Sequence, residues 1–215
     1  MADEIKKKSQ ADEPAQMELP IEYHIEQFWL KYKNPIVFGV ILILAFAIFT
    51  AIYKHNLTSK EQDSLVALNK AVTAGNIDQV ASVFETYRGT KAASQALLLV
   101  ADMNFQRGQY TQSQELYQRF IREYPQNELL AAAFYGVGAC QQASGKVDEA
   151  LSTYLSLQKS KPTEIWTYHG LLAAASCYEI KGQPAAARKI YQDIISGAAP
   201  DSIKMQAQFN IKRLG

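Results

Sequence analysis

The stretch LLLVADMNFQRGQYTQSQELYQRFIREYP, Leu97–Pro125, recurs twice more in this chain of 215 residues. The related stretches are FYGVGACQQASGKVDEALSTYLSLQKSKP, Phe134–Pro162, and LLAAASCYEIKGQPAAARKIYQDIISGAA, Leu171–Ala199. Equivalent positions are 37 residues apart, and each stretch has two helical patterns separated by a glycine, at Gly108, Gly145 or Gly182. Three matches at one constant period predict a stack of helical hairpins rather than a closed globular core.

Small and bulky residues alternate at fixed places in this repeat. The small positions are Ala101, Gly138 and Ala175 in the first helix, and Ser113, Ala150 and Ala187 in the second. The bulky positions are Tyr117, Tyr154 and Tyr191, followed by Phe120, Leu157 and Ile194. Two antiparallel helices approach closely only where small side chains meet, and a bulky residue then fills the gap toward the neighbouring unit. Glycine tolerates the left-handed conformation that ends a helix, and Pro125 and Pro162 prevent continuation of the second helix.

A degenerate unit precedes the three repeats, and one further helix follows them. In DSLVALNKAVTAGNIDQVASVFETYRGT, Asp63–Thr90, Gly75 is the break and Phe84 stands where the tyrosines stand. The segment DSIKMQAQFNIKRL, Asp201–Leu214, suits a helix that covers the last repeat. The fold class predicted is all-α, with a solenoid over 58–215 made of units at about 58–91, 94–127, 131–164 and 168–200 and a capping helix over 201–214. The pattern resembles the tetratricopeptide repeat, whose usual unit has about 34 residues.

An apolar segment lies upstream of the repeats. The 18 residues from Ile36 to Tyr53 carry no charge, and as a helix they span about 27 Å, close to the roughly 30 Å hydrocarbon core of a bilayer. We therefore predict a transmembrane helix over 35–54. A buried core helix would keep a polar face, which this segment lacks. The remaining alternative is a cleaved export signal, with a small-x-small pattern at Ala45–Ala47, although the apolar run continues beyond it.

The residues before this segment divide in two. Residues 1–19 are polar and are predicted to form a disordered cytoplasmic tail. Residues 20–34 place Ile21, Ile25, Phe28 and Tyr32 on one helical face, which indicates a juxtamembrane amphipathic helix with Phe28, Trp29 and Tyr32 at the membrane interface. The alternative is that these residues are the first turns of the transmembrane helix itself. Lys6, Lys7 and Lys8 favour a cytoplasmic tail, but charges near the apolar segment do not settle the orientation.

The composition offers little chemistry. A formal net charge of +1 gives no reason to expect nucleic acid as a partner. His24, His55 and His169 are isolated in the sequence, and the chain has neither a His-Glu-x-x-His nor a Cys-x-x-Cys motif, so we predict no catalytic residue, cofactor or metal. Cys140 and Cys177 are equivalent residues of stacked repeats, expected about 15 to 20 Å apart. This exceeds the roughly 7 Å limit for a disulfide, which predicts two free, buried thiols.

The inner face of the solenoid is the candidate binding surface. Tetratricopeptide domains that hold chaperone C-termini use Lys and Asn on the first helix of each unit, and none of the corresponding positions here has Lys, Arg or Asn. A carboxylate clamp is therefore not expected. The sequence instead predicts an apolar partner-binding groove around Leu98, Phe105, Tyr135 and Leu172. The alternative is that these side chains only pack between units.

The order of these elements carries a closer resemblance. The short tail, the aromatic residues of QFWLKYKN (Gln27–Asn34), one span, a degenerate first repeat and KGQPAAARKIYQD (Lys181–Asp193) resemble bacterial inner-membrane tetratricopeptide-like proteins known as ancillary subunits of the Sec translocon. The resemblance implies a single-pass protein with a cytoplasmic N-terminus and a periplasmic solenoid. It also implies translocon subunits, a periplasmic chaperone and exported clients as partners, and no enzymatic activity. An envelope-assembly or cell-division scaffold with the same parts is the alternative function.

Overall fold

The computed structural model describes residues 21–160 and 165–215. Within these two ranges the chain forms nine α-helices and no strand. The helices are α2 (Ile21–Thr73), α3 (Ile77–Thr86), α4 (Lys91–Gln106), α5 (Tyr110–Glu123), α6 (Leu130–Ala143), α7 (Val147–Ser160), α8 (Ile165–Ile180), α9 (Pro184–Ser196) and α10 (Asp201–Arg213). The chain divides into two compact units at Asn56 and Leu57, so α2 contributes to both. The predicted all-α, tetratricopeptide-like solenoid is confirmed.

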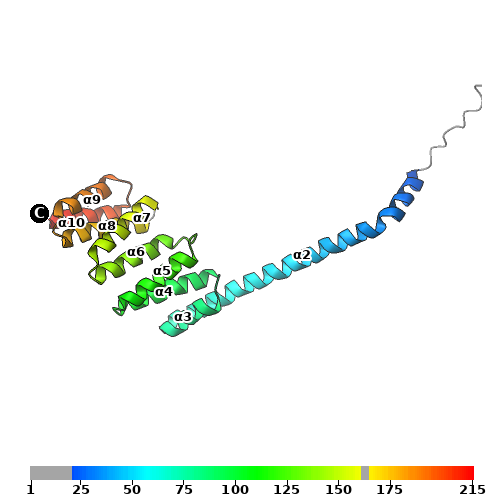
Figure 1. Ribbon diagram of the computed structural model, residues 1–215, viewed down its shortest axis with the longest axis horizontal. Coiled ribbons are helices and arrows are strands. Elements are labelled where there is room, and N and C mark those ends of the chain that lie inside the picture. Colours follow the sequence, from blue (N-terminus) through cyan, green and yellow to red (C-terminus); the bar gives the residue numbers. More distant parts are fainter. Residues whose placement is uncertain (1–20, 161–164) are drawn as a thin grey trace, which may run out of the picture. The chain divides into compact units, whose positions relative to one another are not determined.

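The second unit is a row of helical hairpins. Each helix from α3 to α10 packs against the next one in the sequence, and the first helices of neighbouring hairpins also touch, as α4 does α6 and α6 does α8 (Figure 1). The hairpins are α4–α5, α6–α7 and α8–α9, preceded by the last turns of α2 with α3. Helix α10 packs against α9 and α8 and covers the last hairpin.

Glycines end the first helix of each hairpin as the repeat predicts. Gly108, Gly145 and Gly182 have φ angles of 74°, 78° and 71°, in the left-handed region. A residue with a Cβ atom is strained in this region, which explains why the position holds glycine in all three repeats.

The small and bulky repeat positions form the core. Ala101, Ala175, Ala150, Ala187 and Ser113 are completely buried, and the Ser113 hydroxyl donates a hydrogen bond of 2.8 Å to the Ala101 carbonyl oxygen across the helix pair. Among the largest fully buried side chains are Tyr154, Tyr191, Phe120, Leu157 and Ile194. The small residues therefore bring paired helices together, while the bulky residues fill the space between hairpins.

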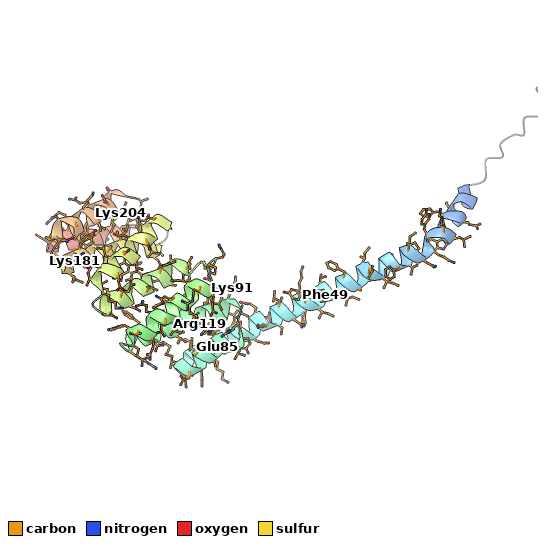
Figure 2. The ribbon with its side chains drawn as sticks, in the orientation of Figure 1. Phe49, Glu85, Lys91, Arg119, Lys181 and Lys204 are labelled. Carbon is orange, nitrogen blue, oxygen red and sulfur yellow. The ribbon has the colours of Figure 1, made fainter. Side chains whose placement is uncertain are left out.

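The degenerate first hairpin is held by apolar packing and by ion pairs. Leu68 and Ala71 of α2 join Val80 and Phe84 of α3 in one core cluster. The Arg119 guanidinium of α5 lies 4.3 Å from the Phe84 ring centre and 3.1 Å from Glu85 (Figure 2). One cation thus connects the second hairpin to the first through both an aromatic face and a carboxylate.

Helix α2 differs from the prediction of two separate helices over 20–34 and 35–54. It is one helix from Ile21 to Thr73, with Pro35 inside it rather than at a start. Figure 1 shows a bend in its N-terminal, blue portion. Proline removes one backbone hydrogen bond and crowds the preceding turn, so it bends a helix without necessarily ending it. The predicted disordered tail over 1–19 and the closing Pro162 lie outside the described residues.

The apolar part of α2 is long enough to cross a bilayer. A window of 18 residues within Phe28–Thr73 has a mean hydropathy of 2.8, and none of that window is buried. Phe49, for example, projects from the helix with 66% of its surface exposed (Figure 2). The core helix of a globular protein would be mostly buried, so the core-helix alternative is wrong. An export signal would meet the same criteria of length and composition.

Candidate functional site

A groove lies on the first helices of the three regular hairpins. It has a volume of about 240 Å³. Its lining consists of Leu98, Asp102 and Phe105 from α4, Tyr117 from α5, Ala132, Tyr135, Gly136 and Ala139 from α6, and Trp166 from α8. The structure therefore brings together three of the four residues predicted for the groove, Leu98, Phe105 and Tyr135.

Leu172 is not part of this lining. It packs instead on the cluster that α8, α9 and α10 form around Tyr191, Ile194 and Ile203. Position 172 is equivalent to Tyr135 in the repeat, but the next element beside α8 is the capping helix rather than another hairpin. The repeat equivalence alone therefore placed Leu172 in the groove wrongly.

Aromatic rings form one wall of the groove. The Tyr135 ring centre lies 5.4 Å from that of Trp166 and 5.7 Å from that of Tyr154. His169 lies 5.6 Å from Trp166 but is not among the residues that line the groove. On the α4 side, Phe105 lies 5.2 Å from Tyr110. These separations are typical of favourable tilted aromatic pairs, which hold the wall rigid.

Trp166 lines the groove but is not among the groove residues predicted from the sequence. Its repeat equivalents are Ala92 and Leu129; Ala92 is buried in the core, and Leu129 is partly buried and packs against it. A tryptophan at a position that elsewhere holds alanine or leucine was the available signal, because its larger ring system cannot fit into the same space. It extends into the groove instead.

One carboxylate lies among these apolar side chains. The Tyr117 hydroxyl donates a hydrogen bond to Asp102 Oδ1. Partial burial by the groove walls raises the pKa of Asp102, and the hydrogen bond from Tyr117 opposes this. Burial raises the pKa of Tyr117 well above its ordinary value, and the neighbouring Asp102 adds to the effect. Asp102 nevertheless retains an exposed surface, so an incoming group can reach it.

This pairing departs from the other two repeats. The Tyr154 hydroxyl donates to Gln142 Oε1 at 3.2 Å, and the Tyr191 hydroxyl donates to Glu179 Oε1 at 2.7 Å, in each case twelve residues earlier in the chain. The equivalent of Gln142 and Glu179 in the second hairpin is Phe105, which cannot accept a hydrogen bond. Tyr117 turns to Asp102, about one helical turn before Phe105. Two positions of α4 therefore differ from the other repeats: Phe105 replaces the hydrogen-bond acceptor and adds apolar surface, and Asp102 supplies the carboxylate.

Glycine allows the floor of the groove to form. A Cβ atom on Gly136 would lie 2.4 Å from Tyr117 Cζ. The absence of a side chain at position 136 therefore lets the Tyr117 ring lie directly against the backbone of α6, where its hydroxyl reaches Asp102.

The predicted membrane-interface residues lie on α2. Phe28, Trp29 and Tyr32 have exposed fractions of 57%, 53% and 40%. The ring centres of Phe28 and Tyr32 are 4.8 Å apart, so these two residues share one face of the helix.

No cluster of three His, Cys, Asp or Glu side chains that could hold a metal ion occurs in residues 21–160 and 165–215. Cys140 and Cys177 are free and buried, as predicted. Burial raises the pKa of both thiols, and Cys140 Sγ donates a hydrogen bond of 3.3 Å to Ser113 Oγ.

The tetratricopeptide repeat-like domain family matches residues 26–215. The chain belongs to this family. The match covers the complete row of hairpins together with most of α2. No curated protein sequence matches the chain.

The chain is similar to several solved structures at low sequence identity. PcrH from Pseudomonas aeruginosa is 19% identical, with a TM-score of 0.50 over 58% of this chain and 93% of PcrH. The type III secretion translocator chaperone SycD from Yersinia enterocolitica is 22% identical, with a TM-score of 0.49 over 62% of this chain and 96% of SycD. The repeats of a kinesin light chain candidate from Podosopora anserina are 13% identical, with a TM-score of 0.52 over 74% and 85%. The likeness to PcrH and to the kinesin light chain repeats is one of fold alone.

Proposed function

We propose that this protein is a membrane-anchored interaction module that holds segments of other proteins in the groove of its solenoid. The observation that carries the proposal is the groove itself, where Phe105, Tyr135 and Trp166 expose ring surface beside one carboxylate. Concave surfaces with aromatic walls and few polar groups are typical of recognition sites. Membership of the tetratricopeptide-like family, whose repeats mediate protein interactions, supports this reading. A binding role needs no catalytic residue, and we propose none.

The exposed apolar face of α2 supports the anchor. Its membrane-length window is unburied, and Phe28, Trp29 and Tyr32 suit the headgroup region, where aromatic side chains are enriched. A single span would keep the solenoid at a lipid surface. The anchor would then determine which proteins the solenoid meets.

The resemblance to the ancillary subunits of the Sec translocon supplies the finer proposal. In that reading the N-terminus is cytoplasmic, the solenoid is periplasmic, and the partners are translocon subunits, a periplasmic chaperone and exported clients. The groove would hold such clients close to the membrane where they emerge.

Site-specific photo-crosslinking in intact bacterial membranes tests the proposal. A photoreactive amino acid at position 135 reports on the groove, and one at Phe46 reports on the anchor. We expect exported proteins or chaperones at the first position and translocon subunits at the second. Products from envelope-assembly or division proteins at both positions would instead favour the scaffold alternative.

The double variant Phe105→Ala and Tyr135→Ala tests the groove independently. We expect it to lose the partners recovered with the wild-type protein from solubilised membranes. Phe209→Ala is the matched control, because Phe209 is an aromatic residue on α10 with 68% of its surface exposed and no place in the groove. Unchanged recovery with the double variant would overturn the groove proposal.

The anchor is tested by membrane extraction at alkaline pH. Replacing Ile43 and Leu44 by Asp should release the protein into the soluble fraction, because each Asp near the bilayer centre costs about 2.5 to 3.5 kcal/mol. Ile180→Asp adds a charge at an exposed apolar residue of the solenoid and should leave the protein in the membrane. A wild-type protein that is already soluble and lacks its first residues would show that the segment is an export signal.

A further inference from the structure

We infer that the groove selects segments in which a basic side chain stands next to a bulky apolar one, with Asp102 binding the cation and the aromatic wall binding its neighbour. This inference rests on the proposed function and adds the chemistry of the partner.

The charge of the groove is one-sided. Asp102 is the acidic residue of the lining, and no Lys, Arg or His occurs among the lining residues. Several other acids of the solenoid are paired with cations: Glu179 with Arg213, Asp148 with Lys181, and Glu85 with Arg88 and Arg119. Asp102 has the neutral Tyr117 hydroxyl as its partner. A carboxylate that is partly shielded from water and lacks a cation is stabilised when an incoming ligand supplies one.

The aromatic wall favours the same ligand chemistry. Tyr135 and Trp166 present ring surface to the groove, and such surfaces attract both apolar side chains and the cations of Lys and Arg. An acidic ligand would meet Asp102 and the electron-rich ring faces, with no cation in the lining to offset the repulsion. The groove therefore discriminates by charge as well as by shape.

The size of the groove limits what enters it. Its volume of about 240 Å³ is below the range of about 300 to 1,000 Å³ that is typical of small-molecule sites. It accommodates one or two side chains of a passing chain, with the backbone of that chain at the mouth. This size is compatible with a short peptide segment, the kind of ligand that the proposed function requires.

Fluorescence anisotropy with labelled hexapeptides tests the inference on the full chain in detergent micelles. The peptides are Ac-GSFKSG, Ac-GSFESG and Ac-GSAKSG, each carrying an uncharged dye at an added C-terminal group. We expect the Phe-Lys peptide to bind about tenfold more tightly than the Phe-Glu peptide, and the Ala-Lys peptide to bind weakly.

Two variants locate the selectivity. Asp102→Asn removes the charge but keeps an oxygen that can accept the Tyr117 hydrogen bond, so the variant should fold and lose the preference for Lys over Glu. Glu149→Gln removes the same charge at an exposed position of α7 outside the groove and should keep the preference.

The outcomes separate the two proposals. Binding of both Phe peptides with equal affinity, or a preference that persists in Asp102→Asn, would overturn this inference while supporting the groove as a binding site. A failure of all three peptides to bind would count against the proposed function as well.

Discussion

Tyr117 donates its hydroxyl hydrogen bond to Asp102, fifteen residues earlier, although the equivalent tyrosines of the next two repeats reach back twelve residues. The difference arises because Phe105 occupies the place of the usual acceptor. A hydrogen bond that differs in one repeat while the others keep it indicates that this repeat meets a requirement beyond packing, such as binding. Here the difference coincides with the groove.

The first prediction restores the repeat. Phe105→Gln should let Tyr117 donate to residue 105, as Tyr154 does to Gln142. Losing the contact with Tyr110 costs about 0.5 to 1.5 kcal/mol and the new hydrogen bond returns about 1 kcal/mol, so the free energy of unfolding should change little while binding of the Phe-Lys peptide is lost. Chemical denaturation and anisotropy measure the two effects. Gln106→Ala, at the exposed neighbouring residue, should change neither, and retained peptide binding in Phe105→Gln would contradict the role of the ring.

The second prediction concerns stability and pH. The pKa of Asp102 is raised above its ordinary value of 3.8, mainly by burial, so the folded protein holds this proton more tightly than the unfolded chain does. The resulting stabilisation is fully present below the unfolded pKa and is lost as pH rises through the folded pKa. Relative to wild type, Asp102→Asn should therefore become more stable as pH rises from about 3 to about 7.

Glu85 provides a control of opposite sign. Hydrogen bonding from Arg88, followed by the other contacts with Arg88 and Arg119, lowers its pKa from the ordinary 4.5. Its stabilisation is present above the unfolded pKa and is lost as pH falls through the folded one, so Glu85→Gln should become less stable relative to wild type as pH rises. Denaturant titrations from about pH 3 to about pH 7 measure how the free energy of unfolding of each variant, relative to wild type, changes with pH. If both variants changed in the same direction, at least one of the two pKa shifts would have the wrong sign.

The third prediction concerns close packing at the groove floor. Gly136→Ala places a Cβ atom 2.4 Å from the Tyr117 ring and should lower the free energy of unfolding by about 1 to 3 kcal/mol through overpacking. Gly170→Ala is the matched control. Its Cβ would lie 3.1 Å from Cδ1 of the buried Leu157, which has to shift by only a few tenths of an ångström, and the gain of about 0.5 to 1 kcal/mol from replacing a helical glycine offsets this smaller crowding. Thermal unfolding should separate the two variants, and equal midpoints would disprove the contact.

The fourth prediction concerns the thiols. Cys140 and Cys177 are buried and their pKa values are raised by burial, so both should react very slowly with a thiol reagent such as 5,5′-dithiobis(2-nitrobenzoate) in the native protein. In denaturant both should react promptly. A Ser202→Cys variant introduces an exposed thiol on α10 and should show one fast-reacting group under native conditions. Rapid reaction of the wild-type protein would place a thiol at the surface.

Much of the solenoid was accessible from the sequence because its determinants are local and repeated. Gly108, Gly145 and Gly182 indicate helix ends by their backbone freedom alone, and the small residues at helix contacts recur at one period. That α2 continues through Pro35 could not be predicted from such local signals. Proline is common in the first turn of a helix, so Pro35 on its own suggests a helix start. The helix is continuous because the residues on both sides of Pro35 are helical, which Pro35 alone does not indicate.

The groove was predictable only in part. Leu98, Phe105 and Tyr135 follow from the helical positions that face inward, but Leu172 depends on which element packs beside α8, and Trp166 depends on where a large ring finds space. The hydrogen bond from Tyr117 to Asp102 required the relative position of two helices. Repeat equivalence describes the average hairpin, while a binding site arises from departures from that average.

The packing of each helix against its sequence neighbours also bears on biogenesis. Because almost every contact joins elements made in immediate succession, a hairpin can complete its interior soon after the ribosome has produced it, without waiting for the C-terminus. Such a chain acquires its structure progressively from the first hairpin onward, and a polypeptide that passes slowly through a narrow channel can fold on the far side as it emerges.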